Sequence, residues 1–115
     1  GDEALAAAQR ITHALFSGAL DTLTENDLIS LQQDGMSATA VAPEGVGLLA
    51  LMTEAGLAPS NGAARKLVSS GGVSLNGEKV VDPALVLGAD NGLFGRFYIL
   101  RKGKKTWHLA YRKVG

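Results

Sequence analysis

The sequence predicts an α+β fold, in which a helical N-terminal extension precedes a small twisted sheet, antiparallel or mixed, packed against two helices. Two observations carry this prediction. Apolar residues recur with the helical period in four segments between residues 2 and 70. Residues 73–111 contain short runs of apolar and β-branched residues joined by turn residues. Helical patterns first and strand patterns later are typical of an α+β domain.

Residues 2–16 form the first predicted helix. Alanines dominate this segment, acidic residues lie in its first turn, and Ser17-Gly18 ends it. One broad stripe is expected to face the core. The stripe consists of Ala4, Leu5, Ala8, Ile11, Thr12, Leu15 and Phe16.

A second, short helix is predicted to begin after Thr24, because Asp27 follows it at the spacing of a capping box. Leu28 and Leu31 form the apolar face of this helix, and Gly35 ends it.

Residues 36–46 are interpreted as a linker or a short extended piece, because they contain Pro43 and Gly45. We therefore place a domain boundary here. It divides a helical linker region, residues 1–44, from a compact domain, residues 45–115.

Two further helices are predicted to meet at a tight corner. The first spans residues 46–56, where Gly56 suits the left-handed cap position and Pro59 prevents continuation. Ser60 is a favourable N-cap for the next helix, residues 61–70. The apolar face of the first helix consists of Leu48, Leu51, Met52 and Ala55. On the second, the helical period places Ala64, Leu67 and Val68 on one side and Arg65, Lys66 and Ser69 roughly opposite.

Two hairpins are predicted after Gly71-Gly72. Asn76-Gly77 between short apolar runs is the strongest short-range hairpin signal. A second hairpin joins residues 97–101 to residues 106–111 through the basic connection at residues 102–105.

Charge is divided unevenly along the chain, although the formal net charge is zero. Residues 1–59 carry eight acidic side chains and one basic one, a net charge of −7, whereas residues 60–115 have a net charge of +7. From Arg96 onward there are seven basic residues and no acidic one. This asymmetry predicts a polyanionic partner for the basic half, although mutual neutralisation of the two halves in the fold would also account for it.

Composition excludes several classes of site. The chain has no cysteine, which removes disulfides, thiolate metal sites and cysteine nucleophiles. An apolar run of about 18 residues and a secretory signal pattern are both missing, so we expect no membrane partner and a cytoplasmic location. Because the sequence begins at Gly1 inside a helical pattern, we expect a piece of a longer protein.

Patterns for catalysis are scarce, and we expect neither catalytic residues nor a metal site. His13 and His108 are far apart in sequence and are interpreted as surface or packing residues. Histidines and carboxylates do not cluster at metal-ligand spacing, and no G-x-S-x-G elbow occurs. Gly72 and Gly77 have the spacing of a phosphate loop, but the Lys and Ser or Thr that must follow are missing.

A nucleic-acid-binding function fits the basic C-terminal segment better. Clustered lysine and arginine side chains neutralise phosphates, and aromatic residues between them could stack on exposed nucleobases. The basic residues are Arg96, Arg101, Lys102, Lys104 and Lys105, and the aromatic ones are Tyr98, Trp107 and Tyr111. Trp107 shares one face of its predicted strand with Leu109 and Tyr111, so packing is favoured over stacking for Trp107. Arg65 and Lys66 are plausible members of the same basic surface.

A motif within residues 48–83 resembles the S-four-like RNA-binding domain, also called the alpha-L motif. It reads LMTEAGLAPSNGAARKLVSSGGVSLNGEKVVDP. The resemblance rests on a helix, a Gly-Leu-Ala corner, a Ser-initiated helix carrying Ala-Arg-basic-Leu, and then Gly-Gly-Val and Asn-Gly. The flanking segments AAAQRITHALFSGAL and GLFGRFYILRKGKKTWHL are similar to the C-terminal region of bacterial-type tyrosyl-tRNA synthetases.

The resemblance implies a domain that binds tRNA for tyrosine, chiefly its long variable arm and its anticodon side. The family's basic positions match residues on the second motif helix and on the basic hairpin. Lys79 is added because it lies beside the glycines of the motif, Gly71-Gly72 and Gly77. The RNA-binding candidates are therefore Arg65, Lys66, Lys79, Arg101, Lys102, Lys104 and Lys105. Asn61 departs from the family, which commonly has a basic residue after the N-cap serine, and this weakens any phosphate contact there.

The resemblance also implies a homodimeric parent enzyme, an ATP-dependent tyrosine–tRNA ligase, whose catalytic domain would be a partner of this chain. ATP would belong to that domain, and this chain by itself is expected to be neither an enzyme nor a cofactor-binding protein. Two alternatives stay open. The motif could come from another RNA-associated protein, such as a pseudouridine synthase or a ribosomal protein, or acidic residues 1–44 could dock on a partner protein.

Overall fold

The structure is a computed structural model that describes residues 2–17, 20–35, 37–103 and 106–112. Its main helices are α1 (Asp2–Ser17), α2 (Glu25–Ser30), α3 (Leu48–Glu54) and α4 (Asn61–Ser69). Its strands are β1 (Ala38–Val41), β2 (Val46–Gly47), β3 (Val73–Leu75), β4 (Glu78–Lys79), β5 (Val86–Leu87), β6 (Phe97–Lys102) and β7 (Thr106–Arg112). Short helical turns lie at Leu20–Thr22, Leu31–Gly35 and Ala89–Asn91.

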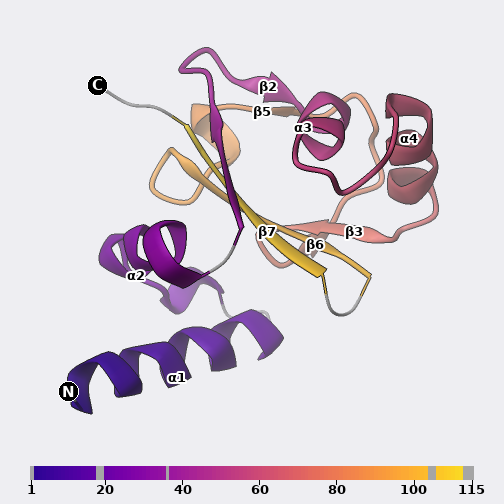
Figure 1. Cartoon of the computed structure of the whole chain (residues 1–115). Helices are drawn as coiled ribbons and strands as arrows, with labels where there is room; N and C mark the ends of the chain where they lie inside the picture. The colour runs from indigo at the N-terminus through magenta and orange to yellow at the C-terminus, as the bar shows by residue number, and fades with distance from the viewer. Residues whose placement is uncertain (1, 18–19, 36, 104–105, 113–115) are drawn as a thin grey trace.

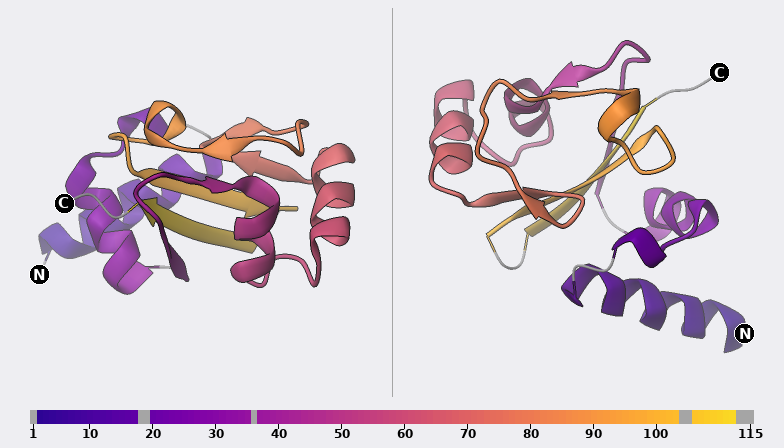
Figure 2. Two further views of the ribbon diagram at one scale, coloured as in Figure 1. Left: turned by 90° about the horizontal axis from the view of Figure 1, so that it is seen from above. Right: turned by 180° about the vertical axis from the view of Figure 1, so that it is seen from behind.

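A mixed five-stranded sheet in the order β1-β7-β6-β3-β4 forms the centre of the molecule. β1 runs parallel to β7, and the other neighbouring strands are antiparallel. β2 and β5 form a separate two-stranded ribbon. α3 and α4 lie on one side of the sheet, whereas α1 and α2 lie on the other (Figures 1 and 2). The predicted α+β class, with a small sheet packed on two helices, is therefore confirmed.

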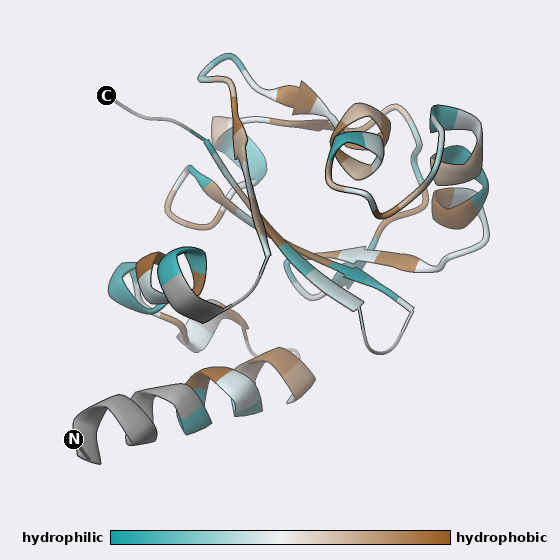
Figure 3. Ribbon diagram, in the orientation of Figure 1, coloured by the Kyte–Doolittle hydropathy of each residue, from teal (hydrophilic) through white to brown (hydrophobic). Residues whose placement is uncertain are grey.

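β6 separates two hydrophobic cores, because its side chains alternate between the two faces of the sheet. Tyr98 and Leu100 belong to the core formed with α3 and α4. Phe97 and Ile99 belong to the core formed with the helices at the N-terminus. Hydrophobic residues accordingly gather where these elements face the sheet (Figure 3). Burial of a Leu- or Phe-sized side chain contributes about 1.5–3 kcal/mol, so both cores hold the sheet in place.

β1 is the strand that the sequence analysis treated as a linker or a short extended piece. It pairs in parallel with β7, from Ala38 opposite Leu109 to Val41 opposite Arg112. Val41 is buried in the α3–α4 core. An edge strand of the central sheet thus lies before the predicted boundary at residues 44 and 45, and that boundary stays a prediction.

Two helix ends have the same capping geometry. After α3, Gly56 has φ 81°, its N–H donates to the Thr53 carbonyl, and the Leu57 N–H donates to the Met52 carbonyl. After α4, Gly71 has φ 80°, and the same pair of bonds forms from Gly71 to Val68 and from Gly72 to Leu67. Both are Schellman motifs, which require the left-handed conformation that glycine adopts without strain. The glycines at residues 71 and 72 therefore end α4 and lead into β3.

The helices differ from the predictions at two points. Val46 and Gly47 pair with Leu87 and Val86 as β2 and β5, so α3 begins later than expected. In α1, Ile11 is buried as predicted, but Phe16 is 65% exposed and Thr12 is also exposed. Ala14, which the predicted stripe omitted, is buried instead. Within residues 9–17, the face that contacts the core is therefore rotated from the predicted stripe toward Ala14, whereas the predictions for Ala4, Leu5 and Ala8 concern side chains that the structure does not describe.

Candidate nucleic-acid interface

α4 presents Arg65 and Lys66 to solvent, because its opposite side is used for packing. Ala64 and Val68 are fully buried in the α3–α4 core, whereas both basic side chains are exposed. The N-terminus of the helix is fixed by Ser60, whose hydroxyl accepts a hydrogen bond from the Ala63 N–H at 3.1 Å. The two basic residues are therefore placed as the helical period predicts.

Lys79 lies at the C-terminal end of α4, although it belongs to β4. A Cβ atom placed on Gly71 would be only 3.3–3.4 Å from the Cδ, Cε and Nζ atoms of Lys79. The side chain thus runs over the glycine that caps the helix. A cation is favourable there, because the last carbonyls of a helix carry partial negative charge. Lys79 therefore extends the basic surface of α4 at the end that carries Lys66.

Arg101 and Lys102 point to opposite faces of the sheet, because they are neighbours in β6. Lys102 lies on the α3–α4 side, and its Nζ donates a hydrogen bond of 2.7 Å to the Leu57 carbonyl. Arg101 lies on the α1 side, where its guanidinium carbon is 4.7 Å from the centroid of the Trp107 ring. The structure therefore brings Lys102 to the corner between α3 and α4, but it places Arg101 on another face.

The remaining two hairpin candidates, Lys104 and Lys105, lie outside the described residues, so their role stays a prediction. The strands that lead to them pair in register as far as Lys102 and Thr106. The second hairpin is therefore where the sequence predicts it, between residues 97–102 and 106–112.

The aromatic residues of the basic segment have different environments. Tyr98 is fully buried, its hydroxyl donates to the Gly88 carbonyl, and burial raises its pKa. It is therefore a core residue and cannot stack on a nucleobase. Trp107 is half-buried and packs against the α1–α2 core, as its strand alternation predicts, but its ring also meets Phe16 and Arg101.

Asn61, the residue that departs from the family pattern, connects two helices. Its Oδ1 atom accepts a hydrogen bond of 2.7 Å from the Thr53 hydroxyl of α3. The side chain is exposed and lies at the first position of α4. In this chain it thus helps to fix the angle between α3 and α4, a role that the sequence analysis did not identify.

The two histidines behave as surface and packing residues. His13 is exposed, whereas His108 is buried in β7 and its Nε2 lies 2.6 Å from the Thr39 hydroxyl of β1. Burial lowers the pKa of His108, which favours the neutral ring. Within the described residues, no group of three or more His, Cys, Asp and Glu side chains could hold a metal ion.

Comparison with known proteins identifies the family. Residues 27–110 match the model of the tyrosine–tRNA ligase SYY-like C-terminal domain. The chain belongs to this family. It is 43% identical over 109 residues to the tyrosine–tRNA ligase of Aliivibrio salmonicida, which covers 95% of this chain and 26% of the relative. The corresponding protein of Dechloromonas aromatica is 47% identical over the same length and the same shares. The chain thus spans about a quarter of the length of these curated relatives.

A solved structure supports the same family. The solution structure of a tyrosyl-tRNA synthetase C-terminal domain superposes with a TM-score of 0.65 at 29% sequence identity, covering 82% of this chain and 94% of that one. The resemblance to tyrosyl-tRNA synthetase C-terminal domains is therefore confirmed, in preference to a pseudouridine synthase or a ribosomal protein. In the described part of the chain, no helix has the length and apolarity needed to cross a membrane.

Proposed function

We propose that this domain binds tRNA through the basic surface of α4 and the end of the β6–β7 hairpin. The observation that carries the proposal is the pair of exposed cations on α4 in a chain that belongs to the tyrosine–tRNA ligase C-terminal domain family. Arg65 and Lys66 are held on a helix that is capped at both ends, so their backbone positions are fixed before RNA arrives. Preorganised cations lose less entropy on binding.

The chemistry of the surface suits recognition of RNA shape. Lysine and arginine side chains neutralise backbone phosphates, and double-stranded RNA is recognised mostly through its backbone and its 2′-hydroxyl groups. Lys79 lies beside α4, and Lys102 lies next to the α3–α4 corner. Both would add to the positive electrostatic potential of the α4 surface. Lys104 and Lys105 follow Lys102 in the chain and would extend this surface along the hairpin.

The names of the relatives support a proposal for the activity of the whole protein. The domain would act within a longer tyrosine–tRNA ligase in the cytoplasm, presenting tRNA for tyrosine to a catalytic domain that uses ATP. A homodimeric parent and recognition of the long variable arm belong to the same proposal. The described residues of this chain would contribute binding and orientation, not bond formation.

The proposal is tested by the salt dependence of tRNA binding. The double substitution Arg65→Gln with Lys66→Gln should weaken tRNA binding at least about tenfold and reduce the slope of log K against log salt by about 2. The measurement is a filter-binding titration with tRNA for tyrosine at several salt concentrations.

The matched control changes the net charge equally on the other side of the sheet. Gln9→Glu with Gln33→Glu alters exposed residues of α1 and of the turn after α2, away from α4 (Figure 2). This control should leave the slope nearly unchanged. Equal slopes for the wild-type chain and the α4 variant would contradict the proposal, as would equal losses in both double variants.

A further inference from the structure

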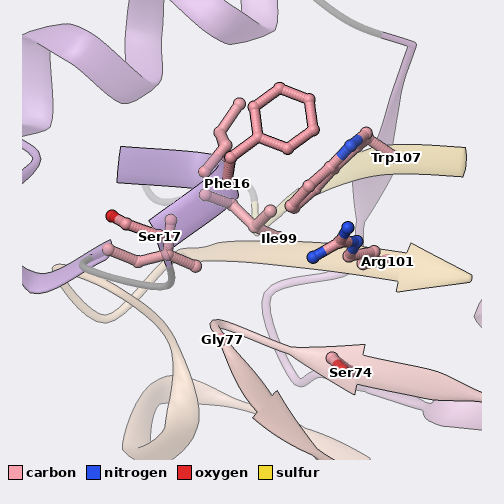
Figure 4. Close-up of a pocket in the computed structure, with 9 residues that line it drawn as sticks. Phe16, Ser17, Ser74, Gly77, Ile99, Arg101 and Trp107 are labelled. Atoms are coloured by element: carbon pink, nitrogen blue, oxygen red, sulfur yellow. The ribbon is translucent and has the colours of Figure 1, made fainter. Parts of the chain in front are cut away.

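A cavity of about 220 Å³ lies between the C-terminal end of α1 and the central sheet. Phe16 and Ser17 border it from α1, Arg101 and Trp107 border it from the hairpin strands, and Gly77 borders it from the Asn-Gly turn (Figure 4). Three segments that are far apart in the sequence therefore converge on one hollow.

The walls of this cavity combine flat apolar surface with a fixed positive charge. The rings of Phe16 and Trp107 meet edge to face, with centroids 6.1 Å apart and an interplanar angle of 82°. The Arg101 guanidinium is stacked on the Trp107 ring, so its position is constrained. Phe16 leaves most of its ring exposed at the edge of the cavity. A planar ligand could therefore contact aromatic carbon on one side and a cation on another.

The register of the sheet continues this wall toward its edge. Trp107 on β7 pairs with Arg101 on β6, and Arg101 pairs with Ser74 on β3. Directly paired residues share a face of the sheet, so these three residues form one row. Aromatic, guanidinium and hydroxyl groups follow one another in this row. These groups suit a ligand that has both a flat ring and an anionic group.

We propose that the cavity receives a single unpaired nucleotide of the bound RNA, with its base against Phe16 and Trp107 and its phosphate beside Arg101. The inference rests on the proposed RNA-binding function and adds the RNA feature that one part of the surface recognises. Unstacked bases are bound by stacking on aromatic side chains and on arginine guanidinium planes.

Size and charge both favour this occupant. The volume of about 220 Å³ is below the roughly 300–1,000 Å³ of sites for drug-sized ligands, so one flat ring system fits better than a longer molecule. Gly77 contributes no side chain, so the Asn76-Gly77 turn borders the cavity with backbone atoms only. Residues 60–115, which supply five of the nine residues that line the cavity, have a net charge of +7, and this charge favours an anion.

The test compares two RNA hairpins that differ by one nucleotide. One has a fully paired stem, and the other carries a single-nucleotide bulge in the same stem. Binding of the 115-residue chain is measured for the wild type, for Phe16→Ala, and for Phe94→Ala as a matched control. Phe94 is also an exposed phenylalanine, at 54%, but it does not line the cavity. Trp107 is the only tryptophan in the chain, so its fluorescence reports on the cavity directly.

The expected result is that the bulge strengthens binding by the wild type at least about fivefold and quenches Trp107 fluorescence. Phe16→Ala should lose this gain, Phe94→Ala should retain it, and all three proteins should bind the unbulged hairpin equally. Equal affinity of the wild type for both hairpins, or a bulge preference that Phe16→Ala retains, would overturn the cavity proposal and leave RNA binding in place. Failure of the wild type to bind either hairpin would overturn the proposed function as well.

Discussion

Asp27 fixes the start of α2 through both of its carboxylate oxygens. Its Oδ1 accepts a hydrogen bond of 2.8 Å from Arg10 Nη2 of α1, and its Oδ2 accepts one of 2.8 Å from the Thr24 N–H. The Asp27 N–H donates in return to the Thr24 hydroxyl at 3.1 Å, which completes the predicted capping box. Chiefly because of the Arg10 guanidinium, the pKa of the buried Asp27 falls to about 2. The carboxylate therefore stabilises α2 and also connects it to α1.

The stability of the chain should depend on pH through this group. Because the pKa of Asp27 is lower in the folded chain than in the unfolded chain, its ionised carboxylate stabilises the fold above about pH 4. This stabilisation is lost as the pH falls toward 2. Asp27→Asn should therefore reduce the free energy of unfolding at pH 7 by about 1–3 kcal/mol. The difference from the wild type should narrow between pH 4 and pH 2. Urea titrations across this range measure it, with Glu44→Gln, an exposed carboxylate, as the control. If the difference in unfolding free energy between the wild type and Asp27→Asn does not vary with pH, it does not arise from the ionised carboxylate of Asp27.

At the level of elements, the glycine after α4 has two separate functions. Gly71 adopts φ 80°, which the Schellman motif requires, and its missing side chain leaves room for Lys79. Both functions follow from the lack of a Cβ atom. The glycine therefore couples the end of the helix to the position of a cation on the candidate RNA-binding surface.

Two glycine-to-alanine substitutions near α4 should have opposite effects. Gly71→Ala should destabilise the chain by about 1 kcal/mol or more, because alanine is strained at this φ and its Cβ would displace Lys79. Gly62→Ala should stabilise it by about 0.5 kcal/mol, because Gly62 lies within α4 and an added Cβ would approach the Ser60 hydroxyl only to an ordinary contact distance of 3.8 Å. Thermal unfolding of both variants measures these effects. Equal changes of the same sign in the melting temperatures of the two variants would show that backbone conformation does not decide the effect on stability.

Local features of the fold were predictable, and distant pairings were not. The Thr24 and Ser60 caps and the Asn76-Gly77 turn depend on residues within a few positions of one another, and the structure confirms them. A short extended piece was one of the two interpretations of residues 36–46, but its pairing with β7 was not predicted, because β7 lies about 70 residues later and a short segment carries no information about a parallel partner. The separation of Arg101 from Lys102 could have been predicted from strand alternation alone. The cavity could not, because it depends on how α1 packs across the sheet.

At the scale of the whole molecule, the acidic N-terminal helices cover the sheet face opposite α3 and α4. Leu23, Leu28 and Leu31 are buried against Phe97, Ile99 and Leu109 in a core of their own. Arg96 Nε of the basic half lies 3.4 Å from Glu25 Oε2 of the acidic half, so part of the charge asymmetry is neutralised across this contact. Docking of the acidic helices on another protein stays a hypothesis, which would use surface that this packing leaves exposed.

Truncation at the predicted boundary tests how the two regions depend on each other. Removing residues 1–36 exposes the sheet face that α1 and α2 cover, and each buried leucine that is lost costs about 1.5–3 kcal/mol. A domain is stable by only about 5–15 kcal/mol, so the melting temperature should fall by at least about 10 °C. Removing residues 1–44 also deletes β1 and leaves β7 as an unpaired edge, so this fragment should be less stable and more prone to aggregate. Thermal unfolding and light scattering distinguish the two fragments. If the 45–115 fragment is as stable as the 37–115 fragment, β1 is dispensable and the domain boundary lies where the sequence predicts it.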